Sequence, residues 1–172
     1  MLAAAALLAP ICRQHDVALL VNDRPDLALK AGADGVHLGQ EDMAVKDARR
    51  LVGSGPIVGL SVKSVAEAEA APVDLIDYVG SGGVYVTLSK RQKNPPIGPA
   101  GLARIIATLH LRAPQLPVCG IAGIDAGNAA EVIAAGADGV AVISALSLAS
   151  DPEAAARGLR EIVDGMLAKR GT

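Results

Sequence analysis

Two aspartates that follow neighbouring apolar runs carry the first indication of chemistry. Asp23 comes directly after the run VALLVN, and Asp42 comes shortly after the run GVHLG. If both runs are parallel strands of one sheet, the two carboxylates lie at the same edge, where they could share a Mg²⁺ ion with the phosphates of a substrate. The alternative is that each aspartate only caps the helix that follows it. The residue types alone leave both interpretations open.

Hydroxyl groups and cations gather after two later apolar runs. Ser61 ends the run PIVGLS and could donate a hydrogen bond to a phosphate, unless it is a solvated loop hydroxyl. The segment GSGGVYVTLSKRQKNPPIG contains Thr87, Ser89 and Lys90 together with two further cations. A polar loop of this length in a compact domain is often a binding loop; otherwise it is a solvated connection.

Turns of small residues near the end of the chain could bind a phosphate through the backbone. Gly123 lies in GIAGI, and Ile143–Ser144 end the stretch AGADGVAVIS. Backbone N–H groups at such turns, close to the start of a helix, form a nest for a phosphate dianion. His37, in the middle of GVHLG, is more typical of a hydrogen-bonded interior histidine than of a catalytic base.

Six short apolar runs, separated by stretches with helical patterns, must position these residues. The hexapeptide AGADGV occurs twice, each time between a helix and a strand. This alternation predicts a single α/β domain over residues 1–172 with six parallel strands, either an open doubly wound sheet or a (β/α)8 TIM barrel that lacks two strands. The predicted strands are Val17–Asn22, Gly35–Gly39, Pro56–Ser61, Asp77–Gly82, Val118–Ile121 and Gly139–Ser144. The predicted helices are Leu2–Gln14, Pro25–Lys30, Val45–Val52, Ser64–Ala71, Leu102–Leu109, Ala129–Ala135 and Asp151–Lys169, with Asp125 and Asn128 available as caps for the sixth.

Composition narrows the class of partner. The 172 residues are 51% hydrophobic and include no Phe or Trp, so the core must be built from Ala, Val, Leu and Ile, as in buried parallel strands. A net charge of −2 without a long basic run argues against nucleic-acid binding. The apolar start is too short to span a bilayer, so no membrane partner is expected. Cys12 and Cys119 are far apart, which favours a reducing cytoplasm over a disulfide framework.

These motifs, taken in order, resemble those of thiamine phosphate synthase, a TIM-barrel transferase of thiamine biosynthesis. The matching pieces are NDR, GVHLGQED, GLS, VGSGGVYVTLSK, GIAGI and AGADGVAVIS, which cover nearly the whole chain. The resemblance implies a Mg²⁺-dependent reaction that joins hydroxymethylpyrimidine diphosphate to thiazole phosphate and releases pyrophosphate. Departure of pyrophosphate leaves a resonance-stabilised pyrimidine cation, so no covalent nucleophile is needed.

The resemblance also implies a role for each matching residue. Asp23 and Asp42 would hold Mg²⁺ on the diphosphate. The residues expected to contact the pyrimidine diphosphate are Asn22, Ser61 and Lys90. Those expected to hold the thiazole phosphate are Thr87, Leu88, Ser89, Gly123, Ile143 and Ser144.

Two departures from the family pattern shape the expectations for this chain. Ala122 replaces the first glycine of a paired-glycine turn, and a β-α-β segment on the order of 30 residues, with a Q-x-R-x-K stretch, does not precede Met1. We expect an upstream start, repacked strands, or a second copy of the chain at the open edge as a homo-oligomer. We also expect the chain as given to be poorly stable and weakly active. A thiazole tautomerase-like isomerase, which needs no metal pair, and a catalytically impaired phosphate-binding remnant are the alternatives.

Overall fold

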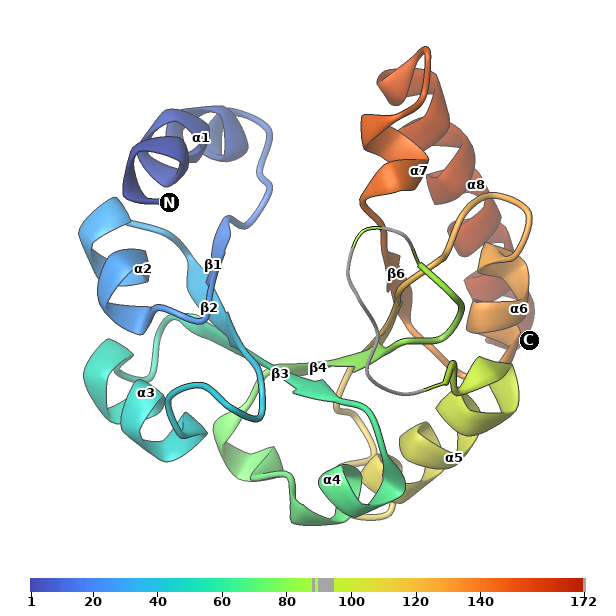
Figure 1. Ribbon diagram of the computed structural model, residues 1–172, viewed down its shortest axis with the longest axis horizontal. Coiled ribbons are helices and arrows are strands. Elements are labelled where there is room, and N and C mark those ends of the chain that lie inside the picture. Colours follow the sequence, from blue (N-terminus) through green and yellow to red (C-terminus); the bar gives the residue numbers. More distant parts are fainter. Residues whose placement is uncertain (88, 90–94, 172) are drawn as a thin grey trace. The chain divides into compact units, whose positions relative to one another are not determined.

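Strands and helices alternate along the chain in the computed structural model, which describes residues 1–87, 89 and 95–171 (Figure 1). The strands are β1 (Leu20–Asn22), β2 (Gly35–Leu38), β3 (Ile57–Val62), β4 (Tyr78–Gly82), β5 (Val118–Ile121) and β6 (Gly139–Ala141). The helices are α1 (Leu2–Gln14), α2 (Pro25–Ala31), α3 (Val45–Val52), α4 (Val65–Ala70), α5 (Gly98–His110), α6 (Ala129–Ala134), α7 (Ser144–Ser147) and α8 (Pro152–Arg170), with the 3-10 turn η1 (Val73–Leu75).

The strand order decides between the two predicted architectures. The six strands follow one another in the sheet as β1-β2-β3-β4-β5-β6. Strand β2 pairs in parallel with β1 and with β3, and β5 pairs in parallel with β6. A doubly wound sheet reverses its strand order at a switch point, whereas a β/α barrel adds each strand beside the previous one. The chain therefore has the α/β fold of the TIM-barrel type, with six parallel strands.

The chain divides into two compact units, each with its own apolar core. The first unit comprises Met1–Ser61 and Pro72–Val79, and the second comprises Val62–Ala71 and Gly80–Thr172. In the first unit α2 packs between α1 and α3. In the second unit α8 packs against α6 and α7, and α5 lies beside α4 and α6. Fully buried aliphatic side chains fill both cores, among them Val36, Leu38 and Val58 in the first and Leu102, Leu109, Val118 and Val132 in the second.

Local sequence signals explain where the helices begin, end and bury a face. Helix α8 starts at its N-cap Asp151, whose carboxylate accepts a hydrogen bond from the Ala154 N–H at 2.9 Å. Helix α4 starts at Ser64, whose hydroxyl accepts from the Glu67 N–H. Helix α2 ends at Gly32 in the left-handed conformation, with φ of +61°. Among the residues that the structure describes, no helix combines the length and the apolarity needed to cross a membrane.

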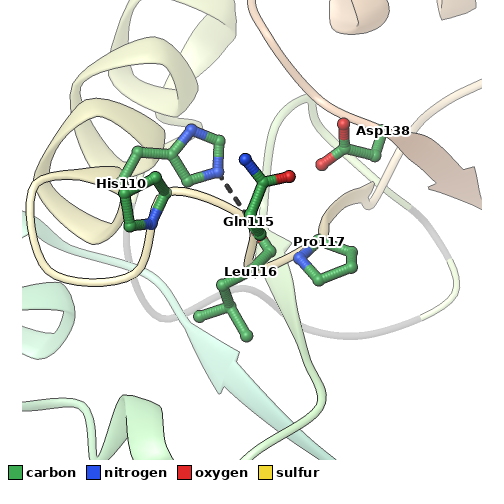
Figure 2. A pocket seen from close by; sticks show the side chains of 6 residues that line it. His110, Gln115, Leu116, Pro117 and Asp138 are labelled. Atoms are coloured by element: carbon green, nitrogen blue, oxygen red, sulfur yellow. Dashed lines mark hydrogen bonds between the residues drawn. The ribbon is translucent and has the colours of Figure 1, made fainter.

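An aspartate stands immediately before each even-numbered strand and forms hydrogen bonds with the neighbouring strand at the amino-terminal end of the sheet. Asp34, Asp77 and Asp138 precede β2, β4 and β6, and Asp138 lines a pocket together with Pro117, the residue before β5 (Figure 2). Their carboxylates accept hydrogen bonds at 2.7 to 2.9 Å from backbone N–H groups at or just before the start of the preceding strand, those of Leu19, Val58 and Val118. The backbone N–H of each aspartate donates to the carbonyl of the same residue at 2.8 Å. The aspartate in each copy of AGADGV thus joins the strand that follows it to the preceding strand through these two hydrogen bonds.

Two predicted strands, Val17–Asn22 and Gly139–Ser144, are each three residues longer than the strands in the structure. Strand β1 begins at Leu20 rather than Val17, because the Val17 N–H still bonds the Cys12 carbonyl as the chain leaves α1. Strand β6 ends at Ala141, and Ser144 starts the short helix α7. The apolar run continues past Ala141, but the backbone turns at Ile143, with φ of −119° and ψ of −73°.

Candidate active site

The two aspartates proposed as metal ligands lie after the ends of adjacent strands in the first unit. Asp23 directly follows β1, and Asp42 follows β2 by four residues. The parallel register pairs Asn22 with His37, so these strand ends meet at one edge of the sheet. The Asp23 N–H donates to the His37 carbonyl at 2.8 Å. Both carboxylates therefore belong to the edge at which β/α proteins place their sites.

Helix capping does not explain either aspartate. The N-cap of α2 is Arg24 and that of α3 is Ala44, and neither helix start has a side-chain cap hydrogen bond. Asp23 instead turns the chain with a left-handed backbone, φ of +65°, a conformation that aspartate tolerates better than most residues. Strain of this kind concentrates at functional sites.

The turn after β2 presents the Asp42 carboxylate in a fixed position. Its Oδ2 accepts a hydrogen bond from the Gly39 N–H at 2.7 Å. A Cβ on Gly39 would lie only 2.9 Å from that oxygen, so a side chain at this position would displace the Asp42 carboxylate. One bond to Oδ2 leaves acceptor capacity on the carboxylate. Two exposed carboxylates at neighbouring strand ends fit Mg²⁺, which takes few protein ligands beside substrate phosphates. Within the described ranges no cluster of three or more His, Cys, Asp or Glu side chains could hold a metal.

Ser61, near the end of β3, is held from two sides. Its hydroxyl oxygen lies 2.9 Å from Nε2 of His37, and Nε2 of Gln40 donates to its carbonyl at 2.7 Å. Nδ1 of His37 lies 2.7 Å from the hydroxyl of Tyr78 in β4. Burial lowers the pKa of His37, and the smaller effect of the nearby Asp42 charge opposes that shift. His37 is therefore the hydrogen-bonded interior histidine that the sequence predicted.

The guanidinium of Arg24 is committed to a neighbour on its own helix. It forms a two-pronged pair with Asp26 at 2.7 and 2.8 Å. The hydrogen bond from Arg24 lowers the pKa of Asp26 to about 2. The other two residues of the motif, Asn22 and Asp23, lie at the end of β1, and both are exposed.

In the second unit, the turn after β5 passes very close to the loop after β4. Gly123 has φ of +66°, and a Cβ there would overlap the Val86 carbonyl oxygen and lie 2.8 Å from the Cβ of Tyr85. The carbonyls of Ile121 and Ala122 accept from the N–H groups of Val84 and Tyr85 at 3.0 Å. Gly123 is therefore at a position where only glycine fits. Thr87 and Ser89 follow within the same loop, where the Ser89 N–H donates to the Thr87 hydroxyl at 3.2 Å.

Asn128 and Asp125 brace the Gly123 turn instead of capping α6 with their side chains. Asn128 occupies the N-cap of α6 without a side-chain cap bond. Its amide donates to the Gly123 carbonyl at 3.0 Å and accepts from the Asp125 N–H at 3.0 Å. Asp125 accepts from the Gly127 N–H at 2.8 Å. The turn that is predicted to bind a phosphate is thus fixed by side chains that the sequence indicated only as helix caps.

Ile143 and Ser144 lie three residues or fewer beyond the end of β6, which is parallel to β5. Both residues are exposed, and Ser144 opens α7 rather than ending the strand. The turns after β5 and β6 therefore occupy the same edge of the sheet within the second unit. Leu88 and Lys90, which complete the predicted set, lie outside the described residues.

Sequence reasoning missed Tyr78, Gln40 and Asn128 as partners of the predicted site residues. Gln40 stands in the motif GVHLGQED, and Asn128 follows the Gly123 turn by five residues, so their positions next to site motifs were the available signal. Tyr78 is the first residue of the apolar strand β4 and carries no comparable signal. Only the register of β2, β3 and β4 brings it to His37.

The fold and the strand-end residues together define an α/β protein of the TIM-barrel type, with polar groups at the carboxyl ends of its strands, where enzymes of this type bind substrates. The family model described as Thiamine monophosphate synthase matches residues 1–146. The chain belongs to this family. The solved thiamine phosphate pyrophosphorylase from Pyrococcus furiosus superposes with a TM-score of 0.84 at 38% identity, covering 96% of this chain and 77% of that one.

Relatives of known name share about half of their aligned residues with this chain. It is 50% identical over 149 residues to the thiamine-phosphate synthase of Chlorobium limicola, covering 87% of this chain and 69% of the relative. It is 51% identical over 162 residues to the thiamine biosynthesis bifunctional protein ThiM/ThiE of Symbiobacterium thermophilum, covering 94% of this chain and 33% of the relative. The chain thus spans a third of the bifunctional relative and about seven tenths of the shorter one.

Proposed function

We propose that this chain is a thiamine phosphate synthase, which joins hydroxymethylpyrimidine diphosphate to thiazole phosphate and releases pyrophosphate. The observation that carries the proposal is the match at about half identity to proteins named for this activity. The arrangement of the strand ends supports it, since carboxylates follow β1 and β2, and Gly123, where a Cβ would overlap the Val86 carbonyl, follows β5.

Residues of the first unit would bind the pyrimidine diphosphate. Asp23 and Asp42 would hold Mg²⁺, which neutralises charge on a departing diphosphate. Asn22 and Ser61 would contact the same substrate. The family resemblance also assigns Lys90 to this substrate, although Lys90 belongs to the second unit and lies outside the described residues. Because the bond to pyrophosphate breaks to leave a stabilised pyrimidine cation, binding the leaving group and positioning the second substrate supply the catalysis.

Residues of the second unit would bind the thiazole phosphate. The Gly123 turn, with Gly123 at a φ of +66°, would offer backbone N–H groups to the phosphate. Thr87, Leu88 and Ser89 would contribute from the loop after β4. Ile143 and Ser144 would contribute from the turn after β6, where both residues are exposed.

We also propose that the chain works on these small molecules in the cytoplasm. Cys12 and Cys119 are free thiols, as expected of a reducing compartment. Whether a second copy pairs with the chain is measured by sedimentation of the purified protein.

The activity test measures both products. The full chain is incubated with the two substrates and Mg²⁺, and thiamine phosphate and pyrophosphate are quantified together. We expect equal amounts of both, and a loss of roughly 100-fold or more in Asp23→Asn and Asp42→Asn. Asp47→Asn, which alters an exposed carboxylate on α3 paired with Arg50, is the matched control. Conversion of the thiazole phosphate without pyrophosphate release would instead identify an isomerase.

A further inference from the structure

A hydrogen-bonded row of three side chains crosses the strands of the first unit and ends on Ser61. Tyr78 in β4 bonds Nδ1 of His37 in β2, and Nε2 of His37 bonds the hydroxyl of Ser61 in β3, at 2.7 and 2.9 Å. The two rings lie with their centroids 5.4 Å apart, tilted by 38°. All three residues are half-buried, so the row is partly shielded from water.

Gly59 is the element of the sheet that makes room for this row. The parallel register places Gly59 of β3 opposite His37 of β2. A Cβ on Gly59 would overlap the ring of Tyr78 and lie 2.5 Å from Nδ1 of His37. The contact between the phenol and the imidazole therefore exists only because this strand position has no side chain. The space that a side chain at position 59 would fill is occupied by the rings of Tyr78 and His37.

The donor and acceptor atoms of the row have one arrangement that suits their chemistry. A neutral imidazole carries one N–H and one lone pair. The phenol is the more acidic of the two hydroxyls, so it is the better donor to the lone pair, which places the proton of the imidazole on Nε2. The lengths agree, because 2.7 Å is typical of an O–H donor and 2.9 Å of an N–H donor.

We propose that Tyr78 and His37 are positioning residues that make the Ser61 oxygen an acceptor, so that its O–H is left to donate to the pyrimidine diphosphate. In the opposite arrangement the Ser61 O–H would donate to Nε2 of His37 and could not donate to the substrate. A hydroxyl turned that way could only accept, and it would repel the acceptor atoms of a diphosphate or a pyrimidine ring. The Gln40 amide, bonded to the Ser61 carbonyl at 2.7 Å, fixes the backbone so that the hydroxyl alone is adjustable.

This inference rests on the proposed function for the identity of the ligand, and one readout is independent of it. Nitrogen NMR of the free, uniformly labelled chain reports which ring nitrogen of His37 carries the proton. The sequence has three histidines, so His15→Gln and His110→Gln assign the spectrum. We expect Nε2 protonated and Nδ1 unprotonated in wild type. A proton on Nδ1 alone would overturn the proposal whether or not the chain is an active synthase.

The kinetic readout uses Tyr78→Phe, which removes the phenol O–H and keeps the ring that fills the space above Gly59. We expect KM for the pyrimidine diphosphate to rise by roughly three- to tenfold, the value of one hydrogen bond, and KM for the thiazole phosphate to stay within about twofold. In a Ser61→Ala background, Tyr78→Phe should have no further effect, since no hydroxyl remains to be oriented. His37→Gln, which keeps an N–H donor for Ser61, should lose less than His37→Leu.

Other results would separate the two hypotheses. Equal changes in both KM values, or the same Tyr78→Phe effect with and without the Ser61 hydroxyl, would overturn the positioning role while leaving the synthase intact. Absence of any thiamine phosphate from the wild-type chain would contradict the proposed function. In that case the NMR result on the free chain still decides the direction of the hydrogen bonds. The exposed His15→Gln variant serves as the activity control.

Discussion

Gly123 is the residue at which adding a single methyl group should reduce the stability of the protein most. Its φ of +66° disfavours any side chain, and a Cβ would also overlap the Val86 carbonyl. We expect Gly123→Ala to lower the free energy of unfolding by roughly 2–4 kcal/mol and to raise KM for the thiazole phosphate more than KM for the pyrimidine diphosphate. Urea titration and steady-state kinetics measure the two effects.

Gly32 provides the matched control for that substitution. Its φ of +61° is nearly the same, and no atom lies within 4 Å of the position that its Cβ would take. Gly32→Ala should therefore show the backbone strain alone, about 1 kcal/mol, with unchanged kinetics. Similar losses of stability in both variants would mean that the close approach of the β4 loop to Gly123 does not matter.

Ala122 is strained where the family pattern has glycine. Its φ is +86°, a conformation that costs an L-residue about 1–2 kcal/mol. Replacing it by glycine removes this strain but frees the unfolded chain, at a cost of about 0.4–1 kcal/mol. Strain relief is the larger effect, so Ala122→Gly should stabilise the protein by roughly 0.5–1 kcal/mol.

Ala107→Gly, at an exposed position within α5, is the control, because it should destabilise by about 1 kcal/mol in the same denaturation assay. A loss of stability in Ala122→Gly would contradict the strained backbone. The sequence showed that Ala122 departs from the family motif. The backbone strain became apparent only with the φ angle.

At the scale of elements, the hydrogen bonds of the aspartate before each even-numbered strand recur along the sheet. Asp77 is the member that pairs with the more buried arginine, and its Oδ2 accepts from the Val58 N–H and from Arg49, each at 2.7 Å. The Arg49 side chain is only 17% exposed and also donates to the Leu75 carbonyl. Removing the carboxylate leaves a largely buried cation and a strand N–H without this acceptor, which is costlier than losing a surface pair.

We expect Asp77→Ala to destabilise the chain by roughly 2–3 kcal/mol, and Asp77→Asn, which keeps an acceptor oxygen, by about half as much. Asp74→Ala, at an exposed position three residues earlier, should change stability by less than about 0.5 kcal/mol. Chemical denaturation of the three variants makes the comparison. If Asp77→Ala unfolds at the same denaturant concentration as Asp74→Ala, the hydrogen bonds of the Asp77 carboxylate contribute no stability.

The same elements show which structural features the local sequence predicted and which it did not. The AGADGV repeat predicted a repeated helix-to-strand unit, and the structure gives its physical purpose at Asp34 and Asp138. The third aspartate, Asp77, lies in LIDYV and was not detected, because the backbone bond that it makes depends on strand pairing and not on its neighbours in sequence. For the same reason the strand predicted to end at Ser144 was wrong: apolar β-branched residues continue to Ile143, while the backbone turns into α7.

For the whole molecule, the alternation of apolar runs and helical stretches was sufficient to predict six parallel strands. It was not sufficient to choose between a doubly wound sheet and a barrel-type sheet, because hydrophobic periodicity reports burial and not which strands are neighbours. The strand-end positions of Asn22, Asp23, Ser61 and Gly123 followed from the sequence. The partners that orient them, such as Tyr78 on Ser61 through His37, come from elements far apart in the chain.

Binding of the leaving group should stabilise the whole chain only when the metal is present. If Asp23 and Asp42 hold Mg²⁺ on a diphosphate, pyrophosphate with Mg²⁺ at about 100 times its Kd adds roughly 2.7 kcal/mol, or about 5–10 °C in Tm for a chain of this size. Pyrophosphate with EDTA should give a small shift, because without the metal the two carboxylates repel the anion. Asp23→Asn and Asp42→Asn should lose the metal-dependent part, and Asp47→Asn should keep it. Equal shifts with Mg²⁺ and with EDTA in wild type would show that pyrophosphate binds without the proposed metal, since thermal melting detects binding whether or not turnover occurs.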